Sequence, residues 1–227
     1  MLLDTPAQLL RTPTLTPGSE ELRAQFPLLQ QAIHGAPLAY LDNAATTAMP
    51  LEVLHALQDF ETRHRANIHR GVHSLSQYAT DDYEAARATL KQFVGATPEH
   101  ELVFTSGTTE SLNLVAHGLW AGGPDQAWLR AGDEIIVSGL EHHANLLPWQ
   151  RAARQNSAVL RLLRPDAQGR LHVADLQALL SPRTRVLALT ASANATGERP
   201  PFEELLRMAA QAGALTVLDA AQAAAYA

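Results

Sequence analysis

The sequence predicts an α/β fold with a mostly parallel sheet and helices on both faces. From residue 102 onward, short apolar runs alternate with amphipathic helical patterns, as in chains built from strand–helix–strand units. The runs are also almost continuously apolar, which is typical of strands buried on both faces of a parallel sheet. Right-handed crossovers between such strands place helices on the two sides of the sheet.

The N-terminal part of the chain has a different pattern. We expect a mobile lead-in over residues 1–18, which are rich in Thr and Pro, and then an N-terminal helical segment over 19–100. Ser19 is suited to cap the first helix. In this segment the pattern predicts helices at 19–26, 50–65 and 76–94, a short strand at 38–41 and a loop at 64–73.

Residues 101–227 form the predicted α/β domain. Strands are expected at 102–105, 134–138, 158–163, 185–190 and 215–219. Helices are expected near 109–120, 145–155, 173–180 and 201–212. Ligands of open α/β sheets collect beyond the carboxyl ends of the strands, so the residues that follow each strand are the candidates for chemistry.

Composition excludes several classes of function. The chain has 227 residues, of which 46% are hydrophobic and 18% charged, and its formal net charge of −6 disfavours a nucleic-acid partner. No window approaches the roughly 20 apolar residues of a membrane span, and the N-terminus lacks a basic signal-peptide region, so we expect a cytoplasmic protein with no membrane partner. Because the chain contains no Cys, it holds no disulfide, thiolate zinc site or cysteine nucleophile. Lys91 is its only lysine.

The segment SGTTES follows the first expected strand and leads into a helix. Gly107 permits a tight turn, and the backbone N–H groups and hydroxyls of Thr108 and Thr109 would form an anion cup at the helix N-terminus. This pattern predicts a phosphate site, although an ordinary helix cap explains it as well.

Polar residues also follow three later strands. His142 and His143 suit ring stacking or acid–base work, or a simple surface pair. Asn194 is a possible polar contact, and Asp219 is either a helix cap or a carboxylate that keeps a heteroaromatic nitrogen protonated, with Gln222 within reach of the same ligand.

A metal site is the competing interpretation for the histidines. His64, His69 and His73 cluster in the sequence, but they fall in an expected loop, and no HExxH or calcium-loop pattern accompanies them. We therefore predict no metal and regard this stretch as a solvated face.

Six motifs together resemble one family. They are YLDNAATT, HRGVHSLSQYAT, ELVFTSGTTESLNLVA, GDEIIVSGLEHHANLLPWQ, SANATG and VLDAAQA, and they run from about residue 20 to the end of the chain. The chain resembles group II (Suf-type) cysteine desulfurases and selenocysteine lyases of the class V aminotransferase family. The resemblance implies a pyridoxal-phosphate (PLP) enzyme with the large domain of fold type I, here truncated.

The resemblance assigns roles to the residues at the strand ends. Thr108 and Thr109 match the phosphate-cup threonines, and His142 matches the histidine that stacks on the cofactor ring and shuttles protons. Asp219 matches the acid paired with the pyridine nitrogen, a pairing that keeps the ring an electron sink.

The resemblance also assigns the residues around the substrate. Asn194 and Gln222 match side chains near the cofactor's phenolic oxygen or the substrate, and Ala44, Ala45 and His69 match positions of the substrate pocket. DAAQ replaces the usual DGAQ, and SANATG replaces SNVTG, but both changes keep the polar residues.

The implied activity is removal of sulfur or selenium from cysteine or selenocysteine to give alanine. The expected partners are this small amino-acid substrate, a second subunit in a full-length homodimer and a sulfur-acceptor protein, as in iron–sulfur cluster assembly. Family members continue with a Ser-Gly-His-Lys strand end, a loop cysteine and a substrate-binding arginine, which this chain lacks. We therefore expect an N-terminal part of the enzyme that is inactive alone. The alternatives are another class V PLP enzyme and a non-catalytic fragment that binds phosphate or a partner.

Overall fold

The computed structural model describes residues 18–119 and 128–226. The chain divides into two compact units, with the boundary between Val103 and Phe104. The expected lead-in over residues 1–18 lies outside the described residues, apart from Gly18. Within the described ranges, no helix is both long enough and apolar enough to cross a bilayer.

Unit 1 is mainly helical, and its helices lie close to where the sequence pattern predicts them. Its elements are α1 (Ser19–Ala24), the 3₁₀ turn η2 (Pro27–Gln30), β1 (Ala32–Ile33), β2 (Ala36–Pro37), α2 (Leu51–Asp59), the π-helical turn η3 (Phe60–His64) and α3 (Ser74–Phe93). Gly18, and not Ser19, occupies the N-cap of α1.

The strand expected at 38–41 is a wrong prediction. The strands of this region are β1 and β2, an antiparallel pair in which Ile33 faces Ala36. The two residues between them, His34 and Gly35, both have positive φ, as a two-residue type I′ hairpin turn requires. The last hydrogen bond of this hairpin runs from the Leu38 N–H to the Gln31 carbonyl at 2.9 Å, and residues 39–41 pair with no strand of the described part of the chain.

The loop at 65–73 is held against α3 by its own polar groups. Ser76, in the first turn of α3, donates its hydroxyl to the carbonyl of Asn67 at 2.6 Å. His73 is the N-cap residue, and its Nδ1 accepts from the backbone N–H of Ser76 at 3.2 Å. A Cβ at Gly71 would clash with the Ser76 side chain, so a residue without a side chain is needed there.

Unit 2 contains the parallel sheet that the sequence predicts. Its strands are β3 (Glu134–Ser138), β4 (Val159–Leu163), β5 (Thr184–Thr190) and β6 (Leu215–Asp219). They lie in the order β4–β3–β5–β6, and every neighbouring pair is parallel. The helices are α4 (Thr108–Gly118), α5 (Leu147–Asn156), α6 (Val173–Leu179) and α7 (Phe202–Gln211), and the turn η4 (His143–Asn145) precedes α5.

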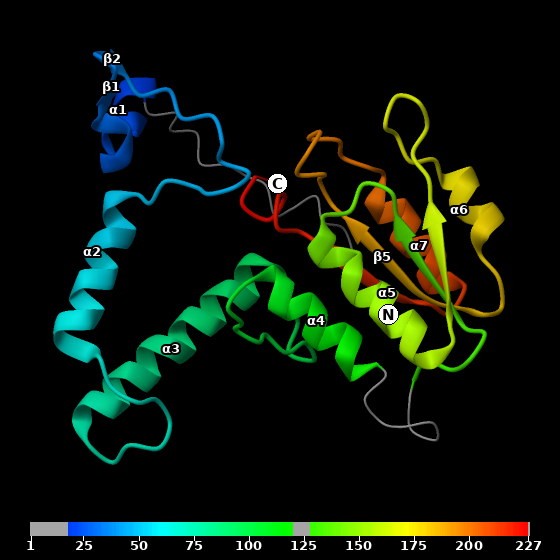
Figure 1. Cartoon of the computed structure of the whole chain (residues 1–227). Coiled ribbons are helices and arrows are strands. Elements are labelled where there is room, and N and C mark those ends of the chain that lie inside the picture. The colour runs from blue at the N-terminus through cyan, green and yellow to red at the C-terminus, as the bar shows by residue number, and fades with distance from the viewer. Residues whose placement is uncertain (1–17, 120–127, 227) are drawn as a thin grey trace. The chain divides into compact units, whose positions relative to one another are not determined.

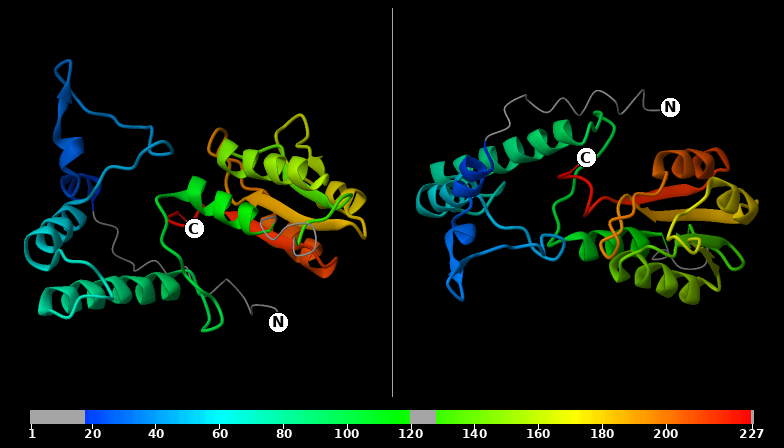
Figure 2. Two further views of the ribbon diagram at one scale, coloured as in Figure 1. Left: turned by 60° about the horizontal axis from the view of Figure 1, so that its bottom comes forward. Right: turned by 90° about the horizontal axis from the view of Figure 1, so that it is seen from above.

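Helices cover both faces of the sheet, which confirms the predicted fold class (Figure 1). Alternate strand residues divide between two buried clusters, because successive side chains of a strand point to opposite faces. Ile135 and Val137 pack with residues of α4 and α5, whereas Ile136 packs with residues of α6 and α7. The views in Figure 2 show the sheet between these two helical layers.

The strand expected at 102–105 is also a wrong prediction. This apolar segment belongs to no strand, and Val103 is 64% exposed. An extended segment becomes a strand only when a neighbour satisfies its backbone hydrogen bonds, and none of β3–β6 pairs with it. Within the described sheet, β6 is an edge strand, because it pairs with β5 alone.

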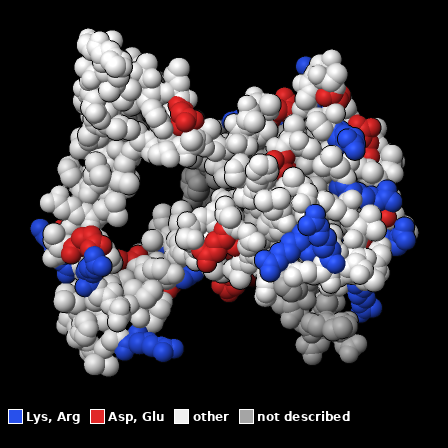
Figure 3. Space-filling view, in the orientation of Figure 1, with Lys and Arg blue, Asp and Glu red and all other residues white. Residues whose placement is uncertain are grey.

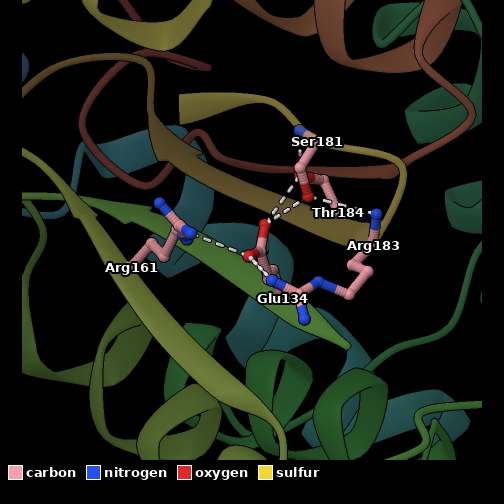
Figure 4. A network of polar contacts seen from close by, with 5 residues as sticks. All are labelled: Glu134, Arg161, Ser181, Arg183 and Thr184. Carbon is pink, nitrogen blue, oxygen red and sulfur yellow. Dashed lines mark hydrogen bonds and ion pairs between the residues drawn. The ribbon is translucent and has the colours of Figure 1, made fainter. Parts of the chain in front are cut away.

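Glu134 is a buried acid at the start of β3 (Figure 4). Ser181 donates its hydroxyl to the carboxylate at 2.6 Å, and Arg161 and Arg183 approach it at 2.9 and 3.4 Å. Burial acts to raise the pKa of Glu134, but the hydrogen bonds from Ser181 and Arg161 and the two positive charges outweigh burial, so that the pKa is lowered. The network joins the start of β3, the middle of β4 and the segment just before β5.

We expect the Glu134→Gln variant to be less stable than wild type by about 1–3 kcal/mol at neutral pH, because an amide replaces the charged acceptor of this network. A lowered pKa stabilises the fold above the ordinary carboxyl pKa, and this contribution disappears as pH falls through the folded pKa. Urea unfolding at pH 7 and at pH 3 measures both effects, and the difference should shrink at pH 3. The exposed Glu203→Gln change on α7 is the control. An undiminished difference at pH 3 would show that charge is not the cause.

The visible face of unit 2 carries both signs of charge. In the space-filling view, acidic and basic side chains are interspersed on it, without a continuous basic surface (Figure 3). Elsewhere in unit 2, Arg185 and Asp133 form a direct ion pair at 3.3 Å. Asp133 is buried in this pair, whereas Arg185 is exposed.

Candidate functional site

The polar residues singled out at the strand ends share one edge of the sheet. Strands β3, β5 and β6 are adjacent and parallel, so their carboxyl ends lie at the same edge. His142 follows β3, Asn194 follows β5 and Asp219 ends β6. The fold thus places three separate sequence segments at the edge where open α/β sheets bind ligands.

His142 has an exposed ring whose orientation is set by the backbone. It is the N-cap residue of η4, and its Nδ1 accepts a hydrogen bond from the N–H of Ala144 at 3.1 Å. In a neutral ring with this bond, the proton is on Nε2. The second nitrogen therefore remains for a ligand.

Asp219 is buried, with only 5% of its surface exposed. Its Oδ1 accepts from the N–H of Ala221 at 3.0 Å, which is the capping role that the sequence left open. Its Oδ2 accepts no hydrogen bond from any residue that the structure describes. Capping therefore uses one oxygen and leaves the other for a ligand donor.

Glu141 is a residue that the sequence reasoning missed, although it lies next to His142. Its carboxylate accepts from the Ser138 hydroxyl, from Asn145 Nδ2 at 2.6 Å and from the backbone N–H of Thr190 at 2.8 Å. Burial raises its pKa to about 7, the charge of Asp219 adds to this effect, and the three hydrogen bonds only partly oppose it. The only signal for Glu141 in the sequence was an acid directly before His142, because burial is not visible in the sequence.

We expect the raised pKa of Glu141 to make unit 2 less stable as pH increases. A raised pKa contributes stability below the unfolded pKa near 4.5, and this stability is lost as pH rises to about 7. A pKa shift of this size changes the free energy of unfolding by about 3 kcal/mol across this pH range. Thermal unfolding of wild type and Glu141→Gln across this range tests the effect, since the variant lacks the titrating group. Parallel pH profiles of the two proteins would contradict the assignment.

The N-terminus of α4 is the position at which the sequence predicts a phosphate cup. Gly107 has φ +150°, a conformation that residues with a side chain rarely adopt. The Ser106 N–H and hydroxyl both donate to Glu110 at 2.6 Å, and these bonds lower the pKa of Glu110. The first N–H groups of a helix have no acceptor within it, so those of Thr108 and Thr109 are suited to an anion. Helix α4 also contacts η4, the turn that His142 caps.

The remaining predicted site residues are less closely tied to this edge. Asn194 is exposed in the turn after β5, and Gln222 is half-buried after β6. Ala44, Ala45 and His69 belong to unit 1, whereas all the others belong to unit 2.

Within unit 1, the histidines of the 64–73 loop make polar contacts with protein groups. His64 Nδ1 lies 2.5 Å from Asp82, and His69 Nε2 lies 3.6 Å from Glu84. The backbone N–H of His69 donates to the Thr80 hydroxyl at 2.9 Å. Among the residues that the structure describes, no group of three or more candidate ligands could hold a metal ion.

Comparison with known proteins agrees with this architecture. The family model "Aminotransferase class-V" matches residues 39–226, which is most of the chain. The chain belongs to the aminotransferase class-V family. The family assignment covers every residue of the candidate site.

Several members of the class-V family resemble this chain closely. A probable cysteine desulfurase of Vibrio cholerae is 44% identical over 203 residues, which are 89% of this chain and 49% of the relative. The apo structure of a cysteine desulfurase from Thermococcus onnurineus has 38% identity and a TM-score of 0.79, with 88% of this chain and 47% of that chain covered. The Escherichia coli cysteine desulfurase CsdA has 41% identity and a TM-score of 0.75, with coverage of 90% and 49%. The chain therefore spans about half the length of the relatives that it matches.

Proposed function

We propose that this chain forms the cofactor-binding part of a PLP-dependent cysteine desulfurase, which removes sulfur or selenium from cysteine or selenocysteine and releases alanine. The observation that carries the proposal is the edge of the sheet where His142 and buried Asp219 follow adjacent parallel strands. The names of the class-V relatives, at 38–44% identity, favour desulfuration within the family.

The residues of this edge fit PLP. The Oδ2 atom of Asp219 is an acceptor in a buried carboxylate, and it suits a protonated ring nitrogen. The exposed ring of His142 suits stacking on a flat heteroaromatic ring. The N-terminus of α4, with the hydroxyls of Thr108 and Thr109, suits a phosphate.

When bound, PLP withdraws electrons from the bond that is broken in the substrate. Asp219 would hold the proton on the ring nitrogen, because a carboxylate in a buried position stabilises the cation beside it. His142 would exchange a proton at Nε2, because Nδ1 accepts from Ala144. Thr108 and Thr109 would anchor the phosphate and so set the position of the ring.

The other assignments in the proposal are those implied by the family resemblance. Asn194 and Gln222 would contact the phenolic oxygen of the cofactor or the substrate, and Ala44, Ala45 and His69 would line the substrate pocket. The amino-acid substrate, a homodimer of the full-length enzyme, a sulfur-acceptor protein and a cytoplasmic location complete it.

We expect the 227 residues alone to have no desulfurase activity. The chain contains no Cys to receive the sulfur, and its one lysine, Lys91, lies on helix α3 of unit 1 and does not match the lysine that binds PLP covalently. Alanine release from cysteine, with added PLP, measures this. Turnover above the rate of free PLP would contradict the expectation.

A chimera tests the proposed function directly. In it, this chain replaces the matched half of the Vibrio cholerae relative, so that the rest of that protein is retained. With dithiothreitol as the reductant that releases the transferred sulfur as sulfide, we expect equimolar alanine and sulfide from cysteine. Racemised or transaminated products would favour another class-V enzyme. A folded chimera that binds inorganic phosphate but neither PLP nor cysteine would favour the non-catalytic alternative.

A further inference from the structure

A half-buried carboxylate is linked to both candidate cofactor contacts. Glu141 directly precedes His142 in the chain, and it accepts from Thr190, whose register partner on β6 is Asp219. Its three donors come from three segments, namely the end of β3, the turn η4 and the end of β5.

The hydrogen bonds continue from Glu141 into the core. Asn145 donates Nδ2 to the carboxylate, and its Oδ1 accepts from the indole Nε1 of Trp149 at 2.9 Å. Asn145 and Trp149 are both fully buried. Because Trp149 holds Oδ1, the amide of Asn145 cannot turn over without breaking a buried bond, and its donor stays directed at Glu141.

The charge at this position is not required for packing. A neutral side chain of similar shape would avoid the cost of a buried carboxylate, to which the nearby Asp219 contributes. What a carboxylate supplies, and an amide cannot, is acceptors on both oxygens. Ser138 and Thr190 donate to Oε1, whereas Asn145 donates to Oε2.

We propose that Glu141 is a positioning residue, whose carboxylate holds the turn carrying His142 to the ends of β3 and β5 and so fixes His142 relative to Asp219. The effect of this positioning on catalysis rests on the proposed function. The positioning of His142 itself involves only residues of this chain. The ionisable group that acts on Glu141 is Asp219, at the end of β6, and His142 and His143 follow it in the chain.

The Glu141→Gln variant distinguishes the roles of the two carboxylate oxygens. The amide retains Oε1 for Ser138 and Thr190, but it turns an NH₂ group toward the NH₂ of Asn145 and loses that bond. The Ser138→Ala variant is milder, because it keeps the carboxylate and removes one donor. Loss of that donor should move the titration of Glu141 to higher pH.

The test follows the backbone amide signals of Thr190 and Ala144 by NMR in the 227-residue chain between pH 5 and 9. In wild type, the Thr190 amide should titrate with an apparent pKa near 7. Glu141→Gln should abolish that titration and shift the Ala144 amide, which donates to His142. Ser138→Ala should move the titration upward, and Glu203→Gln should leave both signals unchanged. A Thr190 amide or an Ala144 amide whose signal is unaffected by Glu141→Gln overturns the proposal.

Kinetics of the chimera provide the second readout. Misplacing His142 should lower kcat roughly 10- to 100-fold in Glu141→Gln and leave KM for cysteine within about twofold. An unchanged kcat overturns the claim that the positioning of His142 by Glu141 matters for catalysis. An inactive wild-type chimera is instead a failure of the proposed function, and the NMR result then decides the positioning on its own.

Discussion

Replacing Asp219 with asparagine in the chimera is expected to lower kcat by roughly 100-fold or more, the effect of removing one preorganised electrostatic contact. The change keeps the size of the side chain and the oxygen that accepts from Ala221. It removes the negative charge that would hold a proton on the ring nitrogen of PLP. Steady-state alanine formation measures the loss, and bound PLP is quantified separately to distinguish lower turnover from lower occupancy.

The exposed Asp175→Asn change, in the first turn of α6, is the matched control and should retain full turnover. Both variants lose one negative charge, so a general effect of net charge would appear equally in each. If Asp219→Asn kept wild-type kcat with full cofactor occupancy, Asp219 would be only a cap for the turn that follows β6. The pairing of Asp219 with the ring nitrogen would then be wrong.

Replacing Trp149 with alanine is expected to destabilise unit 2 by about 3–5 kcal/mol. Trp149 is fully buried in the cluster formed by α4, α5 and the sheet. The substitution leaves a large cavity and also removes the donor to Asn145 Oδ1, so that a buried acceptor loses its partner. Urea unfolding followed by circular dichroism measures the change in midpoint.

Trp128, which is 43% exposed, provides the control, and Trp128→Ala should cost much less than Trp149→Ala. Trp149→Phe should fall between the two, because it keeps most of the volume but not the N–H group. Equal unfolding midpoints for Trp149→Ala and Trp128→Ala would contradict the packing described for α5.

Sequence periodicity was sufficient to predict the amphipathic helices and the almost continuously apolar strands. The strands at 134–138 and 215–219 have the predicted bounds, and the helices of unit 2 begin and end within a few residues of prediction. The same reasoning produced the candidate residues after the strands, because parallel strands bring their carboxyl ends to one edge. The roles of these residues remain predictions for the experiments above.

Two failures of sequence reasoning have one physical cause. The segments 38–41 and 102–105 have apolar, strand-like composition, but a strand exists only where another backbone pairs with it. Pairing is a property of the tertiary structure. The hairpin pairing of β1 and β2 ends at Leu38, which donates to Gln31, and none of the described strands pairs with 102–105.

By itself, the sequence determined the fold class, the alternation of strands and helices and the candidate residues at the strand ends, because these follow from local periodicity and chain direction. Only the tertiary structure decided which acids are buried and what they contact. Glu134 and Glu141 look like ordinary charged residues in the sequence, yet each accepts hydrogen bonds from segments far along the chain. The pKa of Glu134 is lowered and that of Glu141 is raised, because burial and partners, and not residue type, set the cost of their charge.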